Sequence, residues 1–160
     1  MGVSSIKLTN NLPKIQGKVE TAALQWLEEA SGELESQTKR NSTSASGQTK
    51  NSWSHKVDRG AGEAVVGSDL TNAIWEEYGT GEFAAEGNGR GSPWYVPVEA
   101  VGGGKKPSYN GQVIIVYGKN GQAFYKTNGK KPKMMLHKAW DKVIPKAKKE
   151  LANKLKKIKV

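Results

Sequence analysis

The sequence contains no cysteine and only two histidines, His55 and His137. The absence of thiols excludes a disulfide framework and a thiolate metal site, and it suits assembly in a reducing cytoplasm. The two histidines are far apart in sequence, so a metal site is not expected. No apolar run approaches the roughly 20 residues that a membrane span needs, and the N-terminus lacks the apolar core of a signal peptide. We therefore expect no metal, no cofactor and no membrane association.

Charge is unevenly distributed along the 160 residues, whose formal net charge is +10. Residues 130–160 hold twelve lysines and two acids, so the rest of the chain is neutral overall. Within that rest, residues 60–104 hold seven acids against Arg90 alone. An acidic middle and a basic end bear on partners and assembly rather than on the fold. The alternative is a lysine-rich helix face that is simply solvated, and both interpretations stay open at this point.

Apolar spacing predicts two long helices, over residues 11–38 and 133–157, each with one polar face. Pro145 lies inside the second helix, where we expect a kink near residues 141–145. The segments between the two helices predict hairpins, a short helix, an edge strand and glycine-rich loops. The expected hairpins lie at 52–67 and 112–126, the short helix at 70–78, the edge strand at 93–98, and the loops at about 40–50, 79–92 and 101–111.

This order of elements defines an α+β fold class. We expect a small antiparallel β-sheet with hairpins, packed by an N-terminal helix and a long C-terminal helix. The length of the chain fits a single domain over residues 1–160.

Candidate catalytic groups do not converge in the sequence. Ser54, His55 and Asp58 include the residue types of a nucleophile–histidine–acid set, but neighbours in a strand point to opposite faces. The adjacent carboxylates Glu76 and Glu77 diverge by about 100° on a helix, so they form no acid–base pair. The glycine-rich segments lack the strand-to-helix context and the Lys-Ser/Thr pair of a phosphate loop. We therefore expect no enzymatic activity.

Residues 73–81, Ala-Ile-Trp-Glu-Glu-Tyr-Gly-Thr-Gly, resemble a motif of small tailed-phage proteins, the tail-component, tail-completion or head–tail joining (neck) proteins. Their motif, Ala-x-x-x-Glu-Tyr/Phe-Gly-Thr, follows a β-hairpin and is matched here by Ala73, Glu77, Tyr78, Gly79 and Thr80. A second run, Gly-x-x-Pro-x-x-Phe/Met-Leu-x-x-Ala, opens the last helix of that family and is matched by Gly129, Pro132, Met135, Leu136 and Ala139. The resemblance covers residues 12–155. The loop before the first strand departs from it, because it lacks the Asp and Leu of the family's Asp-Thr-Gly-x-Leu-x-x-Ser pattern.

The resemblance implies a structural virion protein that forms a ring at the phage head–tail interface and surrounds the DNA channel. Rings of this kind contain six copies, or twelve in some neck layers. The implied partners are further copies of the chain, the connector or head-closure proteins, and the tail-tube or tail-terminator proteins, with transient contact to genomic DNA. Assembly would take place in the bacterial host cytoplasm. A basic nucleic-acid-binding protein is the alternative function, and a small hydrolase is a more remote one.

The candidate interface residues lie in the 77–81 motif, in the glycine-rich segment after it and in the terminal lysine cluster. They are Glu77, Tyr78, Gly79, Thr80, Gly81, Arg90, Lys148, Lys149, Lys156 and Lys157. Tyr78 beside a capping glycine is more simply explained as a packed core residue, and the apolar stripes predict the same for Trp26 and Trp140. We expect the lysines to contact protein in preference to DNA, because channel walls that held DNA tightly would hinder its passage.

Overall fold

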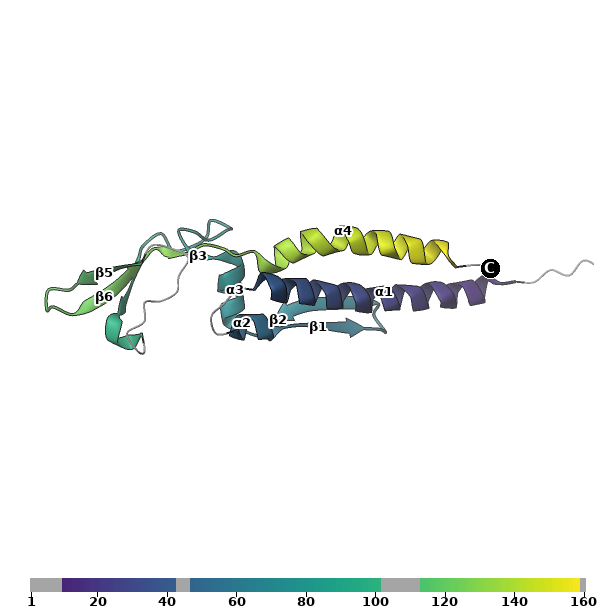
Figure 1. Ribbon diagram of the computed structural model, residues 1–160, viewed down its shortest axis with the longest axis horizontal. Helices are drawn as coiled ribbons and strands as arrows, with labels where there is room; N and C mark the ends of the chain where they lie inside the picture. Colours follow the sequence, from purple (N-terminus) through teal and green to yellow (C-terminus); the bar gives the residue numbers. More distant parts are fainter. Residues whose placement is uncertain (1–9, 43–46, 102–112, 159–160) are drawn as a thin grey trace, which may run out of the picture.

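The computed structural model describes residues 10–42, 47–101 and 113–158 of the chain. Figure 1 shows an elongated molecule with a helical body at one end and an arm of β-strands at the other. The body holds α1 (Leu12–Asn41), α4 (Met135–Lys156) and the antiparallel hairpin of β1 (Trp53–Asp58) and β2 (Glu63–Ser68). The arm is a three-stranded antiparallel sheet of β4 (Trp94–Pro97), β6 (Ala123–Thr127) and β5 (Val113–Tyr117), in that spatial order.

Short elements connect the body with the arm, and we call this region the joint. It consists of α3 (Thr71–Tyr78) and two strands that pair antiparallel, β3 (Thr80–Gly81) and β7 (Gly129–Lys130). The chain leaves the body through β3 and returns to it through β7, so both connections to the arm lie side by side. Two further short helices are α2 (Gln48–Ser52), before β1, and the 3-10 helix η1 (Val98–Ala100), after β4.

α1 is the central element of the body, with α4 along one side and the β1–β2 hairpin along the other (Figure 1). Leu34 of α1 packs against Ala139 and Val143 of α4, and Val66 of β2 packs against the same cluster. Ala139 is fully buried. Its small side chain lets the two helices approach closely, which is how a short stripe of apolar residues holds two long helices together.

Contacts at two levels show that α1 and α4 run antiparallel. At the end of α1, the amide of Asn41 donates a hydrogen bond of 2.8 Å to the carbonyl oxygen of Met135, the first residue of α4. Half-way along α1, the indole Nε1 of Trp26 donates a hydrogen bond of 2.7 Å to the carbonyl oxygen of Ala147. These polar contacts fix the register that the apolar stripe alone leaves adjustable.

A second apolar cluster fastens the joint to the body. Trp53 of β1, Ala73 of α3 and Met135 of α4 are all buried and in contact, and Leu70 packs against them. Because each residue comes from a different element, this cluster fixes where α3 begins and where α4 starts relative to the hairpin.

The α+β class predicted from the sequence is confirmed. The two long helices, the hairpins, the short helix ending at Gly79 and the edge position of β4 all form as expected. The strands do not share one sheet, however. They form three separate sheets, and only the β1–β2 sheet packs along α1.

Four expectations need correction or restriction. Residues 48–50, predicted as loop, begin the short helix α2, and the predicted loop at 101–111 lies outside the described residues apart from Val101. Trp140, predicted as core, is 54% exposed, because it lies on the flank of α4 that turns away from α1. In place of the kink expected near residues 141–145, α4 continues for about three turns beyond Pro145 as one bowed helix (Figure 1).

Candidate functional site

The joint is built around the carboxylate of Glu77, which is only 3% exposed. It accepts hydrogen bonds of 3.0 Å from the main-chain N–H groups of Leu136 and His137, in the first turn of α4. Its Oε1 also lies 2.7 Å from Nδ1 of His137. The first N–H groups of a helix have no partner within the helix, so a carboxylate placed here caps α4 and favours its dipole. Glu77 of α3 is therefore the N-terminal cap of a helix that begins nearly 60 residues later.

The main chain reinforces this connection between α3 and α4. The N–H groups of Lys133 and Met134 donate to the carbonyl oxygens of Glu76 and Glu77, over 2.8 and 3.1 Å. Met134, the residue before α4, has a positive φ of 52°. This left-handed conformation turns the chain from β7 into α4 while its N–H remains bonded.

Glu76 points away from Glu77 and forms ion pairs with Lys130 and Lys133. Its Oε2 lies 2.6 Å from Nζ of Lys133, and all three side chains are largely buried. Burial would raise the pKa of the Glu76 carboxyl, but hydrogen bonds and charge from the two lysines outweigh it and hold that pKa below the ordinary value of 4.5. The adjacent acids thus serve separate contacts, as the prediction that they form no acid–base pair requires.

The Gly-Thr-Gly run of the motif allows β3 and β7, the two connections to the arm, to lie closely side by side. Gly79 ends α3 with φ +74°, and a Cβ built there would lie 2.7 Å from the carbonyl oxygen of Lys130. Gly81, with φ +64°, lies so close to Asn128 that a Cβ would overlap its carbonyl group. Only glycine suits both the positive φ and the close approach. Between them, the hydroxyl of Thr80 accepts the N–H of Lys130 over 3.1 Å.

The structure places the side chains of two further candidate interface residues, Tyr78 and Arg90, at the surface. Tyr78 is not a buried core residue, because it is 37% exposed, and its ring meets the His137 ring in a T-shaped arrangement with centroids 5.6 Å apart. Arg90 is exposed, with its guanidinium over the ring of Trp94 and its Nε donating to Ser92. Neither side chain is held deep in the fold, so both are accessible to a partner.

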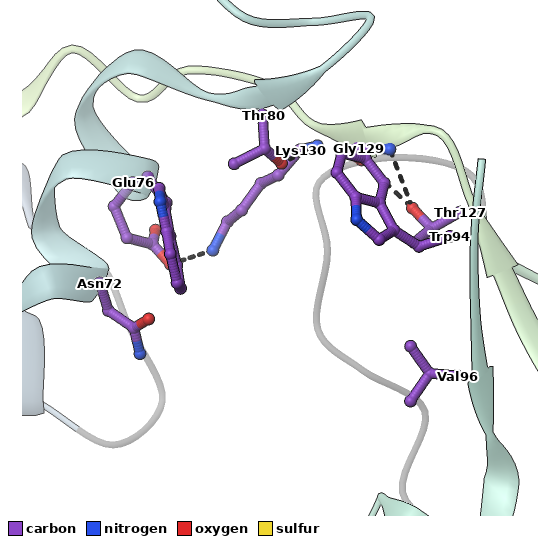
Figure 2. Close-up of a pocket in the computed structure, with 9 residues that line it drawn as sticks. Asn72, Glu76, Thr80, Trp94, Val96, Thr127, Gly129 and Lys130 are labelled. Atoms are coloured by element: carbon purple, nitrogen blue, oxygen red, sulfur yellow. Dashed lines mark hydrogen bonds and ion pairs between the residues drawn. The ribbon is translucent and has the colours of Figure 1, made fainter. Parts of the chain in front are cut away.

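A cavity of about 480 Å³ lies between α3 and the arm (Figure 2). Its polar wall is the ion pair of Glu76 with Lys130, and its apolar walls include two indole rings, of Trp75 and Trp94. The carboxylate is already held by two lysines, so the wall offers a shaped apolar surface rather than a reactive group. The other lining residues are Asn72, Thr80, Val96, Thr127 and Gly129.

The arm exposes large apolar side chains on both of its faces. Pairing in the β4-β6-β5 sheet places Tyr95 and Ile114 on one face, and Ile115 and Tyr117 on the other. All four are exposed, and Tyr117, at the end of β5, is 74% exposed. Such side chains on a thin, projecting sheet are typical of a surface that is covered by a partner.

The four candidate interface lysines, Lys148, Lys149, Lys156 and Lys157, do not form one patch. At 100° per residue, Lys149 and Lys156 share one side of α4, whereas Lys148 lies about 100° away from Lys149. Lys157 follows the last residue of the helix. All four are exposed, so the sequence correctly placed this charge at the surface but did not resolve which lysines act together.

His55, the histidine of the candidate catalytic set, contacts a helix of the body instead. Nδ1 of His55 lies 2.5 Å from Glu35 of α1, and hydrogen bonds from Lys39 and His55 hold the pKa of Glu35 below 4.5. Asp58 instead accepts the N–H groups of Gly60 and Ala61 in the hairpin turn. The three residues Ser54, His55 and Asp58 therefore do not come together as a catalytic set.

Two further observations concern sites of other kinds. Across residues 10–42, 47–101 and 113–158, no three His, Asp or Glu side chains gather closely enough to hold a metal ion. Within the same part of the chain, no helix combines the length and the apolar character that crossing a bilayer requires.

Comparison of the chain with protein-family models, with curated proteins and with solved structures found no match in any of the three.

Proposed function

We propose that this chain is a structural subunit of a tailed-phage virion, which assembles with copies of itself into a ring at the head–tail interface. In this proposal the ring joins the connector to the tail and surrounds the DNA channel, and a hexamer is the expected form, with a dodecamer as the form of a neck layer.

The structure of the arm is the observation that supports self-assembly. It is a three-stranded sheet that stands away from the helical body and exposes apolar side chains on both faces. Among the described residues, the outer edges of β4 and β5 have no paired strand. A sheet with free edges and two apolar faces is prone to pair with another chain, and a protein that uses such a sheet for assembly gains both contact area and main-chain hydrogen bonds.

The placement in a phage particle rests on the resemblance described above. Its two motifs lie 50 residues apart in sequence, and their residues lie together at the joint: Glu77 caps α4 beside Leu136, and Thr80 bonds the strand that contains Gly129. This supports the view that the two motifs together form one structural unit, the joint, which sets the direction of the arm. The same residues are then positioning residues for the interface rather than its contact surface.

The shape of the molecule favours a head-to-tail contact. An arm at one end that covers a surface of the next copy is a heterologous contact, and such contacts close into a ring when the rotation between copies permits. On the body, Trp140 is exposed on the flank of α4 that turns away from α1, and at the joint the cavity beside Trp75 offers a second apolar surface.

The experiment combines electron microscopy with light scattering on the purified chain. Wild type is expected to form ring-shaped particles, and the double variant Tyr95→Ser/Ile114→Thr, which removes one apolar face of the arm, is expected to shift to monomers. Val65→Thr is the control, because Val65 is also an exposed apolar strand residue but lies on the hairpin of the body. Its particles should remain rings.

A second experiment tests the placement. Antibody labelling of phage particles made from a genome that carries this gene should mark the head–tail junction. Particles that lack the protein, or a chain that stays monomeric alone and with purified connector and tail proteins, would overturn the proposal.

A further inference from the structure

α4 presents three different surfaces around its axis, and the sequence alone did not separate them. Ala139, Val143 and Ala147 form the stripe that is buried against α1. To one side of that stripe lies an apolar flank, composed of Trp140, Ile144, Leu151 and Leu155. On the other side, about 150° from that flank at 100° per residue, lies a row of lysines that we call the lysine face, composed of Lys138, Lys142, Lys149 and Lys156.

Within the part of the chain that the structure describes, the lysine face takes part in no ion pair. All four of its side chains are exposed, and none forms an ion pair with another residue that the structure describes. The lysine that does reach an acid of α1 is Lys154, which pairs with Glu29 over 2.8 Å. α4 as a whole has seven lysines against two acids, so its net charge is +5 and most of it is unneutralised at this face.

We infer that the lysine face is a surface for the phosphate backbone of double-stranded DNA. The four lysines lie within about 40° of one another around the helix and extend over about 27 Å of its length, at 1.5 Å per residue. Duplex DNA carries about one negative charge per 1.7 Å of its axis, so a row of this length faces many phosphates. Contacts of lysine with phosphate need no apolar anchor and read no sequence.

The alternative occupant is an acidic protein surface, which the sequence argument favoured. A stable protein interface has an apolar or aromatic core surrounded by charge. On α4 the apolar residues lie on the opposite flank from the lysine face, so a partner that covered the lysines would find no such core beside them. The separation of the two flanks therefore favours DNA for the lysines, and leaves the apolar flank for protein contacts.

The affinity expected from four lysines also answers the objection that tight binding would hinder DNA passage. About four phosphate contacts give a slope of about −3.6 for log K against log salt, so binding weakens by about 100-fold between 50 and 200 mM salt. At physiological salt the contact is weak and rapidly exchanged. The inference goes beyond the proposed ring and does not rest on it, since an isolated subunit presents the same face.

The test measures binding of the full-length chain to a labelled 30-base-pair duplex by fluorescence anisotropy, between about 50 and 200 mM salt. Changing Lys138, Lys142, Lys149 and Lys156 to Gln should weaken binding by at least 10-fold at low salt and flatten the salt slope. The matched control changes Lys14, Lys50, Lys56 and Lys119 to Gln, which removes the same charge from exposed positions elsewhere. It should change the affinity by less than about three-fold.

Particle size and thermal melting of all three proteins keep the result separate from ring assembly, because the lysine-face variant should form the same oligomer as wild type. Absence of DNA binding by wild type at low salt would overturn the inference. Equal losses in both quadruple variants would do so too, because they would show that net charge and not the lysine face is responsible. A labelled polyglutamate peptide that binds the face more tightly than the duplex would assign it to an acidic protein instead.

Discussion

The carboxylate of Glu77 on α3 and the imidazole of His137 on α4 are hydrogen-bonded, with Oε1 2.7 Å from Nδ1. The same carboxylate accepts the main-chain N–H groups of Leu136 and His137, so one buried side chain holds the end of α3 against the start of α4. The strands that lead to and from the arm join these two helix ends directly. The direction of the arm relative to the body therefore depends on a side chain that need not touch any partner.

Replacing Glu77 by Gln removes the charge of this cap but keeps its size. The variant should lower the free energy of unfolding by about 1.5–3 kcal/mol, the range for hydrogen bonds to a charged group. Urea denaturation at fixed protein concentration measures this. Glu20→Gln, at an exposed position of α1, is the control and should change stability by less than about 0.5 kcal/mol. Equal effects of the two variants would show that the cap contributes nothing beyond general charge.

Acidification should weaken the joint through Glu76. The pKa of Glu76 in the folded chain is held below its ordinary value of 4.5. A carboxyl of this kind contributes stability that is complete above the unfolded pKa and is lost as pH falls through the folded pKa. Wild type should therefore lose stability as the pH falls below about 5, and Glu76→Gln should show a smaller loss on the same acidification.

Glu35 titrates in the same direction, so some pH dependence should remain in Glu76→Gln. Urea midpoints measured at several pH values provide the comparison. A variant whose midpoints run parallel to those of wild type would show that the Glu76 ion pairs add no stability.

Gly81 and Gly62 offer a matched pair of glycine positions. Both have positive φ, +64° and +70°, but only at Gly81 would a Cβ overlap a neighbouring main-chain group, whereas nothing lies within 4 Å at Gly62. Gly62→Ala should cost about 1–2 kcal/mol, the cost of the left-handed conformation. Gly81→Ala must also separate β3 from β7 and should cost more than about 4 kcal/mol. Thermal melting of both variants tests this. Similar losses of stability would mean that β3 and β7 can move apart at little cost.

Local patterns in the sequence were sufficient for the long helices and the hairpins of this fold, but not for the short elements α2, β3 and β7. The helices have regular apolar spacing, and the Asn120-Gly121 turn and the alternation around it specify the β5–β6 hairpin. What could not be predicted was which elements share a layer. Trp140 fits the apolar spacing of α4 as well as Val143 does, yet only Val143 faces α1, because the stripe is wider than the contact.

The joint depends on pairs of residues that are distant in sequence, and single-sequence reasoning has no signal for such pairs. The motif marked Glu77 as notable, but its partners, Leu136 and His137, lie some 60 residues further along the chain. Likewise, nothing in the local sequence of β4 or β5 shows that their sheet stands away from the helices. The surface position of the lysines was predictable, because charge at a helix face is a local property. Which lysines share a side of α4 became clear only once the start of that helix and its orientation against α1 were known.

Pro145 is an exposed residue inside α4, and its replacement tests why the helix tolerates it. Proline has no N–H, so the carbonyl oxygen of Asp141 lacks its usual partner one turn later, and proline costs about 3 kcal/mol relative to alanine in a helix interior. Pro145→Ala should therefore raise the free energy of unfolding by about 1–3 kcal/mol in urea denaturation, while Ala152→Pro, at another exposed position of α4, should lower it by a similar amount. A Pro145→Ala variant that is no more stable than wild type would instead indicate that the bow of α4 fits it to α1, so that a straighter helix loses in packing what it gains in hydrogen bonding.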